Sequence, residues 1–254
     1  MNRSHGPYYD ISFGPTMVSP AVKALIWTNV ASFVVTWLLA PSLVGIFGLT
    51  PAVVLERFFV WQPVTYLFLH GSLGHILINM LILWMFGVEL ERLWGTRFFL
   101  RYYFITGVGA ALATIGASLL PAVFGGRLYV TPTIGASGAI YGLLMAFALY
   151  YPTRPILMFF LFPVPAKYFV MIIGAIAFLM STEPGGGIAH MAHLGGLVVG
   201  YLYLRRGRLP FTLGRAGLKA ELKYRYMKWK MARLRKRFDA MSGGQSRDWD
   251  GRIH

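Results

Sequence analysis

Long stretches without any charged side chain are the feature that most constrains how this chain can fold. A helix needs about 20 apolar residues to cross the hydrocarbon core of a bilayer. Each stretch can hold one such helix, and turn residues in the longer ones, such as Pro41 and Pro51, argue against a second. Asp, Glu, Lys and Arg are absent from 24–55, 58–88, 102–126, 128–153 and 184–204, and Lys167 alone interrupts 155–182. We therefore predict an all-α membrane protein with six transmembrane helices, over 22–40, 73–90, 97–119, 136–151, 167–182 and 187–204.

The composition agrees with lipid as the main solvent of this chain. Charged residues make up 13% of it and hydrophobic residues 56%, and the mean hydropathy is +0.57. Soluble domains carry about a quarter charged residues. The absence of cysteine excludes disulfides, a thiol nucleophile and a thiolate metal site. Residues 1–20 lack the long apolar core of a signal peptide, and Pro155, Pro163 and Pro165 predict an interfacial loop over 155–166.

The distribution of basic residues predicts the orientation of the helices. Residues 205–254 hold 15 of the 24 Lys and Arg residues, so the tail is expected in the cytoplasm. With six spans, the N-terminal segment 1–21 lies on the same side of the membrane domain, 22–205, and the expected location is a bacterial inner membrane. The tail 206–254 is either a solvated basic helix or an amphipathic helix on anionic lipid, and we favour the second. Nucleic acid is not expected as a partner, because the net charge of +15 comes mostly from this tail.

Three polar clusters interrupt the apolar spans. The first runs from His70 to Asn79 and includes His75, the second surrounds Ser137, and the third surrounds His193. Ionisable groups inside a membrane are costly, so a functional role is their default interpretation. Spans two, four and six all begin at the outer face in the predicted topology. The three clusters therefore reach a similar shallow depth, which predicts one common site.

Small-residue repeats predict that spans four and six pack closely together. One repeat follows the serine of span four and the other follows the histidine of span six; they are Gly138 with Gly142 and Gly196 with Gly200. Such repeats let two membrane helices approach at short distance. A single glycine pair usually indicates packing alone, but two matched pairs that flank a serine and a histidine predict contact between those side chains.

The residue types in these clusters suit nucleophilic catalysis. A serine hydroxyl needs an adjacent base, and His193 is the candidate base for Ser137. His193 is preferred to His190 because the glycines at its +3 and +7 positions share its helix face. No acidic residue lies in the outer halves of these spans, so the sequence predicts a dyad without an acidic orienting group.

Other residues are expected to support this dyad. Ser137 begins a predicted helix, where the helix dipole favours negative charge. His75 and Asn79 are four residues apart on one helix face, and both can donate hydrogen bonds to an oxyanion. Tyr141 follows the serine by four residues and is a candidate to stack on the imidazole of His193. His70 and His190 are interpreted as structural or interfacial residues.

The same residues resemble the motifs of the rhomboid family of intramembrane serine proteases. Residues 135–142, Gly-Ala-Ser-Gly-Ala-Ile-Tyr-Gly, are similar to the nucleophile motif of that family. Residues 70–79 resemble its second-helix motif, and 192–200, Ala-His-Leu-Gly-Gly-Leu-Val-Val-Gly, resemble its sixth-helix motif. Residues 89–92, Glu-Leu-Glu-Arg, resemble the structural end of the second helix. The resemblance covers about 22–205 and departs at Gln62, where many members carry arginine after the tryptophan.

The resemblance implies a fold and an activity. It implies a six-helix rhomboid-like bundle with a water-filled cavity that opens outward, and a first outer loop, 41–68, that lies partly in the lipid. It implies that His193 is the general base for Ser137 and that His75 and Asn79 serve the oxyanion. Substrates would be single-span membrane proteins that enter sideways and are cut near their outer end through an acyl-enzyme. Nothing in the sequence indicates a cofactor or a metal.

Other classes of protein make different demands on the same residues. A proteolytically inactive rhomboid-like protein that binds membrane partners is the alternative, although such chains usually lose the serine or the histidine. A membrane metalloprotease would need ligands such as His-Glu-x-x-His, which are absent, although four histidines could hold a metal. A transporter predicts an inverted repeat and midplane charges. A soluble hydrolase predicts Gly-x-Ser-x-Gly, which Ala139 interrupts.

Overall fold

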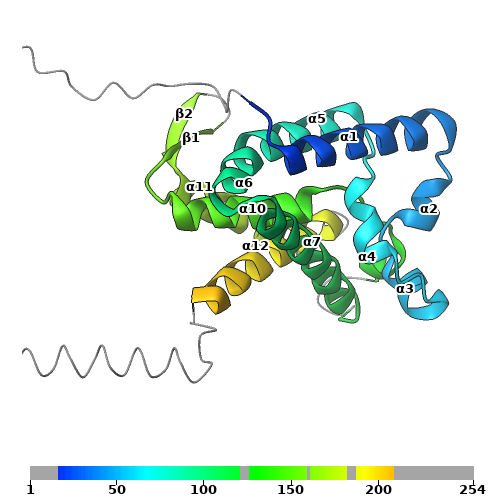
Figure 1. The fold of residues 1–254 in the computed structure, drawn as a ribbon. Helices are drawn as coiled ribbons and strands as arrows, with labels where there is room; N and C mark the ends of the chain where they lie inside the picture. Colours follow the sequence, from blue (N-terminus) through cyan, green and yellow to red (C-terminus); the bar gives the residue numbers. More distant parts are fainter. Residues whose placement is uncertain (1–16, 121–125, 159–160, 182–186, 209–254) are drawn as a thin grey trace, which may run out of the picture. The chain divides into compact units, whose positions relative to one another are not determined.

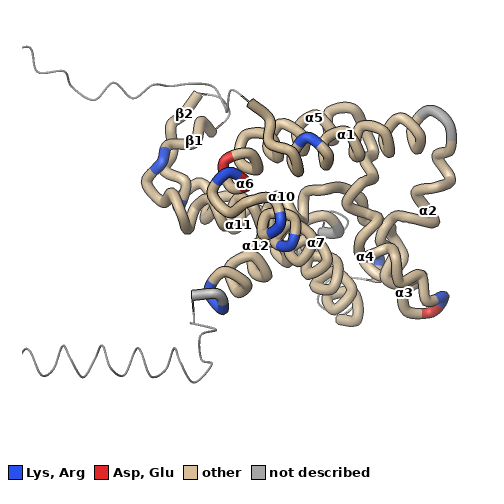
Figure 2. Tube along the Cα trace, in the orientation of Figure 1, with Lys and Arg blue, Asp and Glu red and all other residues tan. Residues whose placement is uncertain are grey.

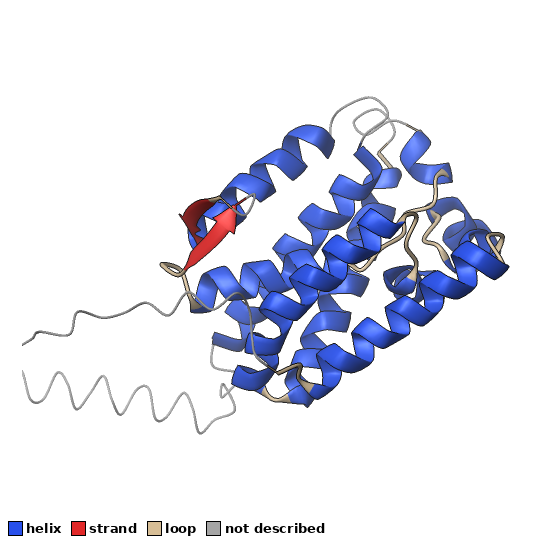
Figure 3. Ribbon diagram, turned by 90° about the horizontal axis from the view of Figure 1, so that it is seen from above, coloured by secondary structure: helices blue, strands red, loops and turns tan. Residues whose placement is uncertain are grey.

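The computed structural model describes residues 17–120, 126–158, 161–181 and 187–208. Within these ranges the chain is mainly helical, and a long helix lies at each of the six positions predicted from the sequence (Figures 1 and 3). The first is α1, Pro20–Val34, which a π-helical stretch, Val35–Leu39, extends. The second combines α5, Leu73–Ile82, a π-helical stretch, Leu83–Gly87, and α6, Val88–Trp94. The other four are α7, Thr96–Ser118; α10, Ser137–Tyr150; α11, Ala166–Ser181; and α12, Gly187–Arg208.

Two of these helices are long and apolar enough to cross a membrane by the criteria of length and composition. They are Leu73–Trp94, which combines α5 and α6, and Thr96–Ser118. Ser137–Tyr150 and Ala166–Ser181 are apolar but shorter. Figure 2 shows Lys, Arg, Asp and Glu gathered toward the ends of the helices, while the middle parts of α5, α7 and α10 carry none. By length and composition, two of the described helices could therefore cross a bilayer, and a count of six spans stays a prediction.

The segment 41–68, predicted to be the first outer loop, holds short helices. They are α2, Leu43–Phe47; α3, Pro51–Arg57; and α4, Gln62–Thr65, which continues into a 3₁₀ turn, Tyr66–Phe68. A further short helix, α9, Arg127–Val130, precedes α10 and packs against α3. The short helices α2 to α4 gather at one end of the bundle (Figure 1). The predicted position of this loop in lipid stays a prediction.

The prediction of a loop over 155–166 was wrong, although the described chain is otherwise mainly helical, as expected. Two short strands, β1, Pro155–Met158, and β2, Phe162–Pro165, form an antiparallel hairpin whose register runs from Pro155↔Pro165 to Met158↔Phe162. The prolines do exclude a helix here, as expected. They are compatible with a two-stranded ladder because a proline can occupy a position whose nitrogen faces an unpaired edge.

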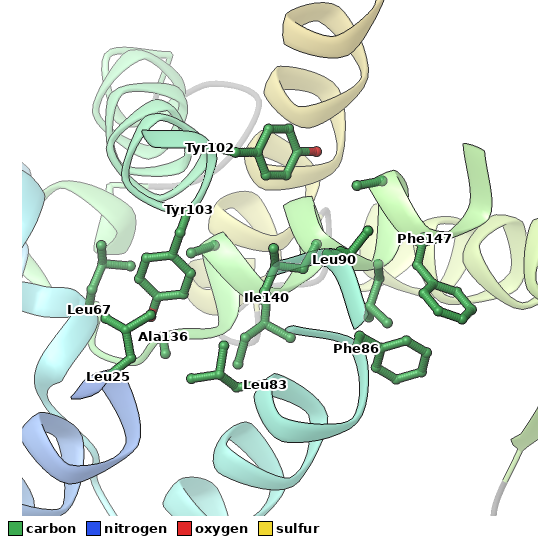
Figure 4. Close-up of a cluster of buried hydrophobic side chains, with 14 of the residues drawn as sticks. Leu25, Leu67, Leu83, Phe86, Leu90, Tyr102, Tyr103, Ala136, Ile140 and Phe147 are labelled. Carbon is green, nitrogen blue, oxygen red and sulfur yellow. The ribbon is translucent and has the colours of Figure 1, made fainter. Parts of the chain in front are cut away.

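Helix α10 lies at the centre of the core. It packs most extensively on α7 and also contacts α5, α6 and α11. Figure 4 shows Ile140 of α10 among apolar side chains from several helices. The labelled neighbours are Leu25, Leu67, Leu83, Phe86, Leu90, Tyr102, Tyr103, Ala136 and Phe147. Because α10 begins at Ser137, this packing fixes the position of the helix that carries the serine.

A buried carboxylate joins the start of α1 to the end of α6. Glu91 is only 3% exposed, and its oxygens accept hydrogen bonds from the N–H groups of Ala21 and Val22 at 2.9 and 3.0 Å. The hydroxyls of Ser19 and Thr96 donate to the same carboxylate. The first N–H groups of a helix lack partners within the helix, and Glu91 supplies them from a distant segment. This contact accounts for the structural role expected of residues 89–92.

The predicted division into 1–21, 22–205 and 206–254 stays a prediction. Most of the N-terminal segment and nearly all of the basic tail lie outside the described residues. The proposed amphipathic helix of the tail and its contact with anionic lipid therefore also remain predictions.

Candidate active site

Ser137 and His193 lie in hydrogen-bonding contact. The Oγ of Ser137 is 2.8 Å from Nε2 of His193, although the two residues are far apart in the sequence. Ser137 is the first residue of α10, and His193 lies in the first half of α12. A hydroxyl at this distance can donate its hydrogen to an unprotonated imidazole nitrogen. The arrangement can therefore generate a serine nucleophile.

Glycine on both helices allows this contact. A Cβ atom at Gly196 would lie 2.0 Å from the carbonyl oxygen of Gly138, and one at Gly200 would lie 3.1 Å from Cα of Gly142. The first distance is shorter than real Cβ contacts and the second is tighter than most of them, so α10 and α12 approach backbone to backbone along these two pairs. The structure thus brings together all four glycines of the two repeats. The close approach brings the imidazole of His193 within reach of the first residue of α10.

An aromatic ring holds the imidazole of His193 in place. The ring of Tyr141 is stacked on it at 4.2 Å between centroids and an interplanar angle of 4°. His190 contacts the same imidazole edge-on, at 5.6 Å. The Nδ1 of His193 is buried and forms no hydrogen bond with any residue that the structure describes. Tyr141 thus contacts the face of the imidazole, and no described residue lies at the in-plane Nδ1 position that an acidic residue occupies in a catalytic triad.

His75 lies on the serine side of the site. A Cβ atom at Gly135 would be 2.7 Å from Nε2 of His75 and 3.7 Å from Oγ of Ser137, so both groups border the same small space. The backbone of Gly135 has φ +124°, which side-chain-bearing residues rarely adopt. Glycine is thus needed at position 135 for two reasons: its backbone conformation disfavours other residues, and a side chain there would collide with His75.

Asn79 lies one turn further along α5. It is buried, and its Nδ2 donates a hydrogen bond of 2.8 Å to the carbonyl oxygen of His75. An amide nitrogen carries two hydrogens, so a second donor remains on the same group. His70 is buried against His75, with ring centroids 4.9 Å apart.

Backbone hydrogen bonds join the 41–68 segment to the residues that lead into Ser137. Leu49 and Thr133 exchange two backbone hydrogen bonds, of 2.9 and 2.8 Å, as an isolated antiparallel bridge. The N–H of Gly135 donates to the carbonyl oxygen of Tyr66 at 2.9 Å. Sequence reasoning missed Leu49, Thr133 and Tyr66, because backbone contacts leave no residue signature. The glycine at 135, which precedes the serine by two, was the one visible signal.

Gln62 stabilises that loop at the point where the chain departs from the usual family motif. Its side chain is fully buried and accepts a hydrogen bond of 3.0 Å from the N–H of Thr50. Its Nε2 donates hydrogen bonds to the carbonyl oxygens of Gly45 and Ile46, at 3.4 and 3.2 Å. A neutral amide thus satisfies both donors and acceptors inside the loop.

An exposed hydrogen bond joins the same loop to α9. The hydroxyl of Tyr129 donates to the carboxylate of Glu56 at 2.7 Å, and this bond raises the pKa of the Tyr129 hydroxyl above its ordinary value. In the part of the chain that the structure describes, no group of three or more His, Cys, Asp or Glu is placed to hold a metal ion. The expectation that the protein uses no metal or cofactor stays a prediction.

The fold and the site together define a class of protein: a helical membrane protein that holds a serine hydroxyl against an imidazole. The family model described as the rhomboid domain matches residues 57–207. This chain belongs to the rhomboid family.

Relatives of the chain support that assignment. It is 33% identical over 138 residues to Rhomboid protein 1, mitochondrial, of Saccharomyces cerevisiae, covering 54% of this chain and 38% of that protein. It is 30% identical over 150 residues to Rhomboid protease GluP of Bacillus subtilis, covering 59% and 26%. It is 30% identical over 151 residues to Rhomboid protease AarA of Providencia stuartii, covering 56% and 54%. The matched region is less than two thirds of the length of each of these relatives.

The relatives also bear on the expected location. They include mitochondrial proteins of yeast and Arabidopsis thaliana as well as bacterial proteins. Membership of the rhomboid family supports a location in a membrane. The relatives do not support the narrower prediction of a bacterial inner membrane.

Proposed function

We propose that this protein is an intramembrane serine endopeptidase that uses a Ser137–His193 dyad. The observation that carries the proposal is the 2.8 Å contact between Oγ of Ser137 and Nε2 of His193. Some relatives bear the name rhomboid protease, which agrees with this reaction. The alternative, a rhomboid-like protein that only binds membrane partners, has no specific observation in its favour, since both side chains are present and in contact.

The chemistry follows from the contact. Nε2 of His193 takes the proton of the Ser137 hydroxyl while Oγ attacks the carbonyl carbon of a substrate peptide bond. The imidazolium then gives that proton to the leaving amine, and an acyl-enzyme ester remains on Ser137. Water, deprotonated by the same nitrogen, attacks the ester carbon; the bond to Oγ breaks, the imidazolium returns the proton to Oγ of Ser137, and the new carboxyl end leaves. The stacked ring of Tyr141 keeps the imidazole in the orientation that both steps need.

Hydrogen-bond donors surround the position where the oxyanion would form. Ser137 begins α10, and the first N–H groups of a helix have no partner within it. His75 borders the same space from α5, and Asn79 has a second amide hydrogen to offer. Donors that are already oriented stabilise the developing charge in the transition state without further reorganisation. We therefore assign His75, Asn79 and the Ser137 N–H as oxyanion donors.

The substrates that we propose are single-span membrane proteins. A site among apolar helices selects a chain that is itself in the bilayer and reaches the serine sideways. The proposed orientation places both termini in the cytoplasm, which puts the start of α10 near the outer surface. Cleavage would then fall near the outer end of the substrate helix.

A serine-directed fluorophosphonate probe tests the nucleophile itself. The full chain in proteoliposomes is expected to gain one covalent adduct on Ser137, because only a serine activated by a base reacts at an appreciable rate. Mass spectrometry of the digested protein locates the adduct. Labelling that persists in Ser137→Ala, or no labelling of the wild-type protein, would contradict the proposal.

His75→Ala tests the oxyanion assignment. We expect kcat to fall by about 10²–10³ with KM little changed, because the lost donor acts only in the transition state. Steady-state cleavage of a reconstituted substrate at several mole fractions in the bilayer separates the two constants. Leu77→Ala is the matched control, since Leu77 lies on the same helix and is 59% exposed. Cleavage by His75→Ala within threefold of the wild-type rate would remove His75 from the site.

A further inference from the structure

The hairpin between α10 and α11 is an apolar element that no part of the proposed reaction uses. Every residue from 155 to 165 is apolar, in the order Pro-Ile-Leu-Met-Phe-Phe-Leu-Phe-Pro-Val-Pro. Turns exposed to water are built largely from glycine, asparagine, aspartate and serine. A hairpin without a single polar side chain is therefore expected to lie in an apolar environment and not in water.

The hairpin packs on the protein mainly through Ile156, and several of its other side chains are exposed. Ile156 is 8% exposed and belongs to the core, and both strands contact α11. Leu157, Leu161 and Phe162 are 41%, 71% and 59% exposed. Surfaces of this kind, when they are continuous, mark contacts with lipid or with another protein.

The backbone of β2 is also adapted to an apolar surrounding. In an antiparallel pair, residues that exchange two hydrogen bonds alternate with residues whose N–H and C=O face outward. Ile156↔Val164 and Met158↔Phe162 can exchange such bonds, whereas Pro163 and Pro165 cannot donate. The two prolines thus occupy the outward positions, and the free edge of β2 lacks N–H donors there. This reduces the cost of placing the edge in lipid and prevents pairing with another strand.

Residues at the base of the hairpin are of the types that usually lie at the level of the lipid headgroups. Arg154 forms an ion pair with Glu89 and lies over the rings of Phe147 and Tyr151, at 5.6 and 5.7 Å from their centroids. Lys167 lies over the ring of Tyr168 at 4.7 Å. Aromatic and basic side chains together are typical of the membrane–water boundary.

The ends of the hairpin continue directly into two apolar helices, α10 and α11, so its base must lie where these helices leave the bilayer. Figure 1 shows the hairpin at the end of the bundle away from α2 to α4. We propose that the 155–165 hairpin is an interfacial anchor, whose exposed side chains Leu157, Leu161 and Phe162 insert among the lipid acyl chains of the leaflet at that end. Arg154 and Lys167 then lie at the level of the phosphates. The partner is the lipid surface rather than a second protein.

Site-directed spin labelling tests this anchor, and the absence of cysteine from the natural chain makes single labels straightforward. Leu161→Cys carries the label at the exposed part of the hairpin. Met171→Cys on α11, 67% exposed, is the reference for a side chain in lipid. Thr153→Cys, exposed in the turn before β1, is the reference near water. Each labelled full chain is reconstituted in phosphatidylcholine vesicles that contain phosphatidylglycerol.

The collision rates of the nitroxide with oxygen and with a water-soluble nickel chelate decide the result. Oxygen concentrates in the acyl region and the chelate stays in water. We expect the label at 161 to resemble that at 171, with an oxygen-to-nickel ratio several-fold above that at 153. A label at 161 as accessible to nickel as that at 153 would overturn the proposal. An immobilised label shielded from both reagents would also overturn it, because protein rather than lipid would then cover the hairpin. Phe162→Cys repeats the test at an independent position.

Discussion

Ser137→Ala and His193→Ala are each expected to lower the rate of cleavage of a reconstituted single-span substrate by about 10⁴–10⁶. Removal of Oγ leaves no nucleophile, and removal of the imidazole leaves a neutral hydroxyl that is a weak one. Because the two groups act as a unit, the double variant should be no slower than either single variant. Gel separation of the cleaved substrate in proteoliposomes measures the rates.

Matched controls separate loss of chemistry from loss of fold. Ser118→Ala removes a buried hydroxyl that donates within its own helix, to the carbonyl oxygen of Ile115 at 2.6 Å, and should leave the rate nearly unchanged. His190→Ala removes an imidazole that contacts His193 only edge-on and should cost far less than His193→Ala. Both dyad variants should keep the thermal unfolding temperature of the wild-type protein within a few degrees. Undiminished cutting by either dyad variant would refute the proposed mechanism.

Gly196→Ala is expected to abolish cleavage as completely as the dyad variants, but through the fold. Its Cβ would lie 2.0 Å from the carbonyl oxygen of Gly138, a backbone atom that no rotamer change can move. Helix α12 must therefore shift away from α10, and this carries His193 away from Ser137. Overpacking of this kind typically costs about 1–3 kcal/mol, and contact with a rigid backbone places this case at or above the upper end. Thermal unfolding and probe labelling of Ser137 should both decline.

Gly116→Ala provides the control for the glycine-to-alanine change itself. Gly116 lies on α7 with no atom within 4 Å of the added Cβ, so the substitution meets open space. Alanine is also the better helix former, by about 1 kcal/mol in soluble hosts, so stability should hold or rise. Equal behaviour of the two variants would mean that the contact between α10 and α12 does not determine the site.

Much of the fold could be predicted because the positions of charged residues and prolines along the chain indicate where helices begin and end. Charge-free stretches and proline positions placed a helix at every position where the structure has a long one, with bounds that differ by a few residues. The same rules failed at 155–165, where prolines indicated a break but could not indicate a strand pair. A two-stranded ladder depends on which residues face each other, and its register is a property of the folded chain.

The side chains of the candidate site could be predicted from the sequence, but the backbone contacts that hold them in place could not. Ser137, His193 and Tyr141 were visible because polar groups inside apolar spans stand out and because spacing places residues on one helix face. The bridge between Leu49 and Thr133 was not visible, since it joins backbone atoms of residues whose side chains take no part. The catalytic roles of the side chains remain predictions that the experiments above address.

The sequence by itself determined that this chain is a membrane-embedded bundle of helices and which side chains could do chemistry, because apolar length and unusual polar residues are local properties of a chain. Only the tertiary structure decided that Gly135 must lack a side chain, that Gln62 satisfies the interior of the first loop, and that 155–165 pairs as a hairpin. Each of these depends on distances between segments far apart in sequence, and such distances are set by the packing of the whole molecule.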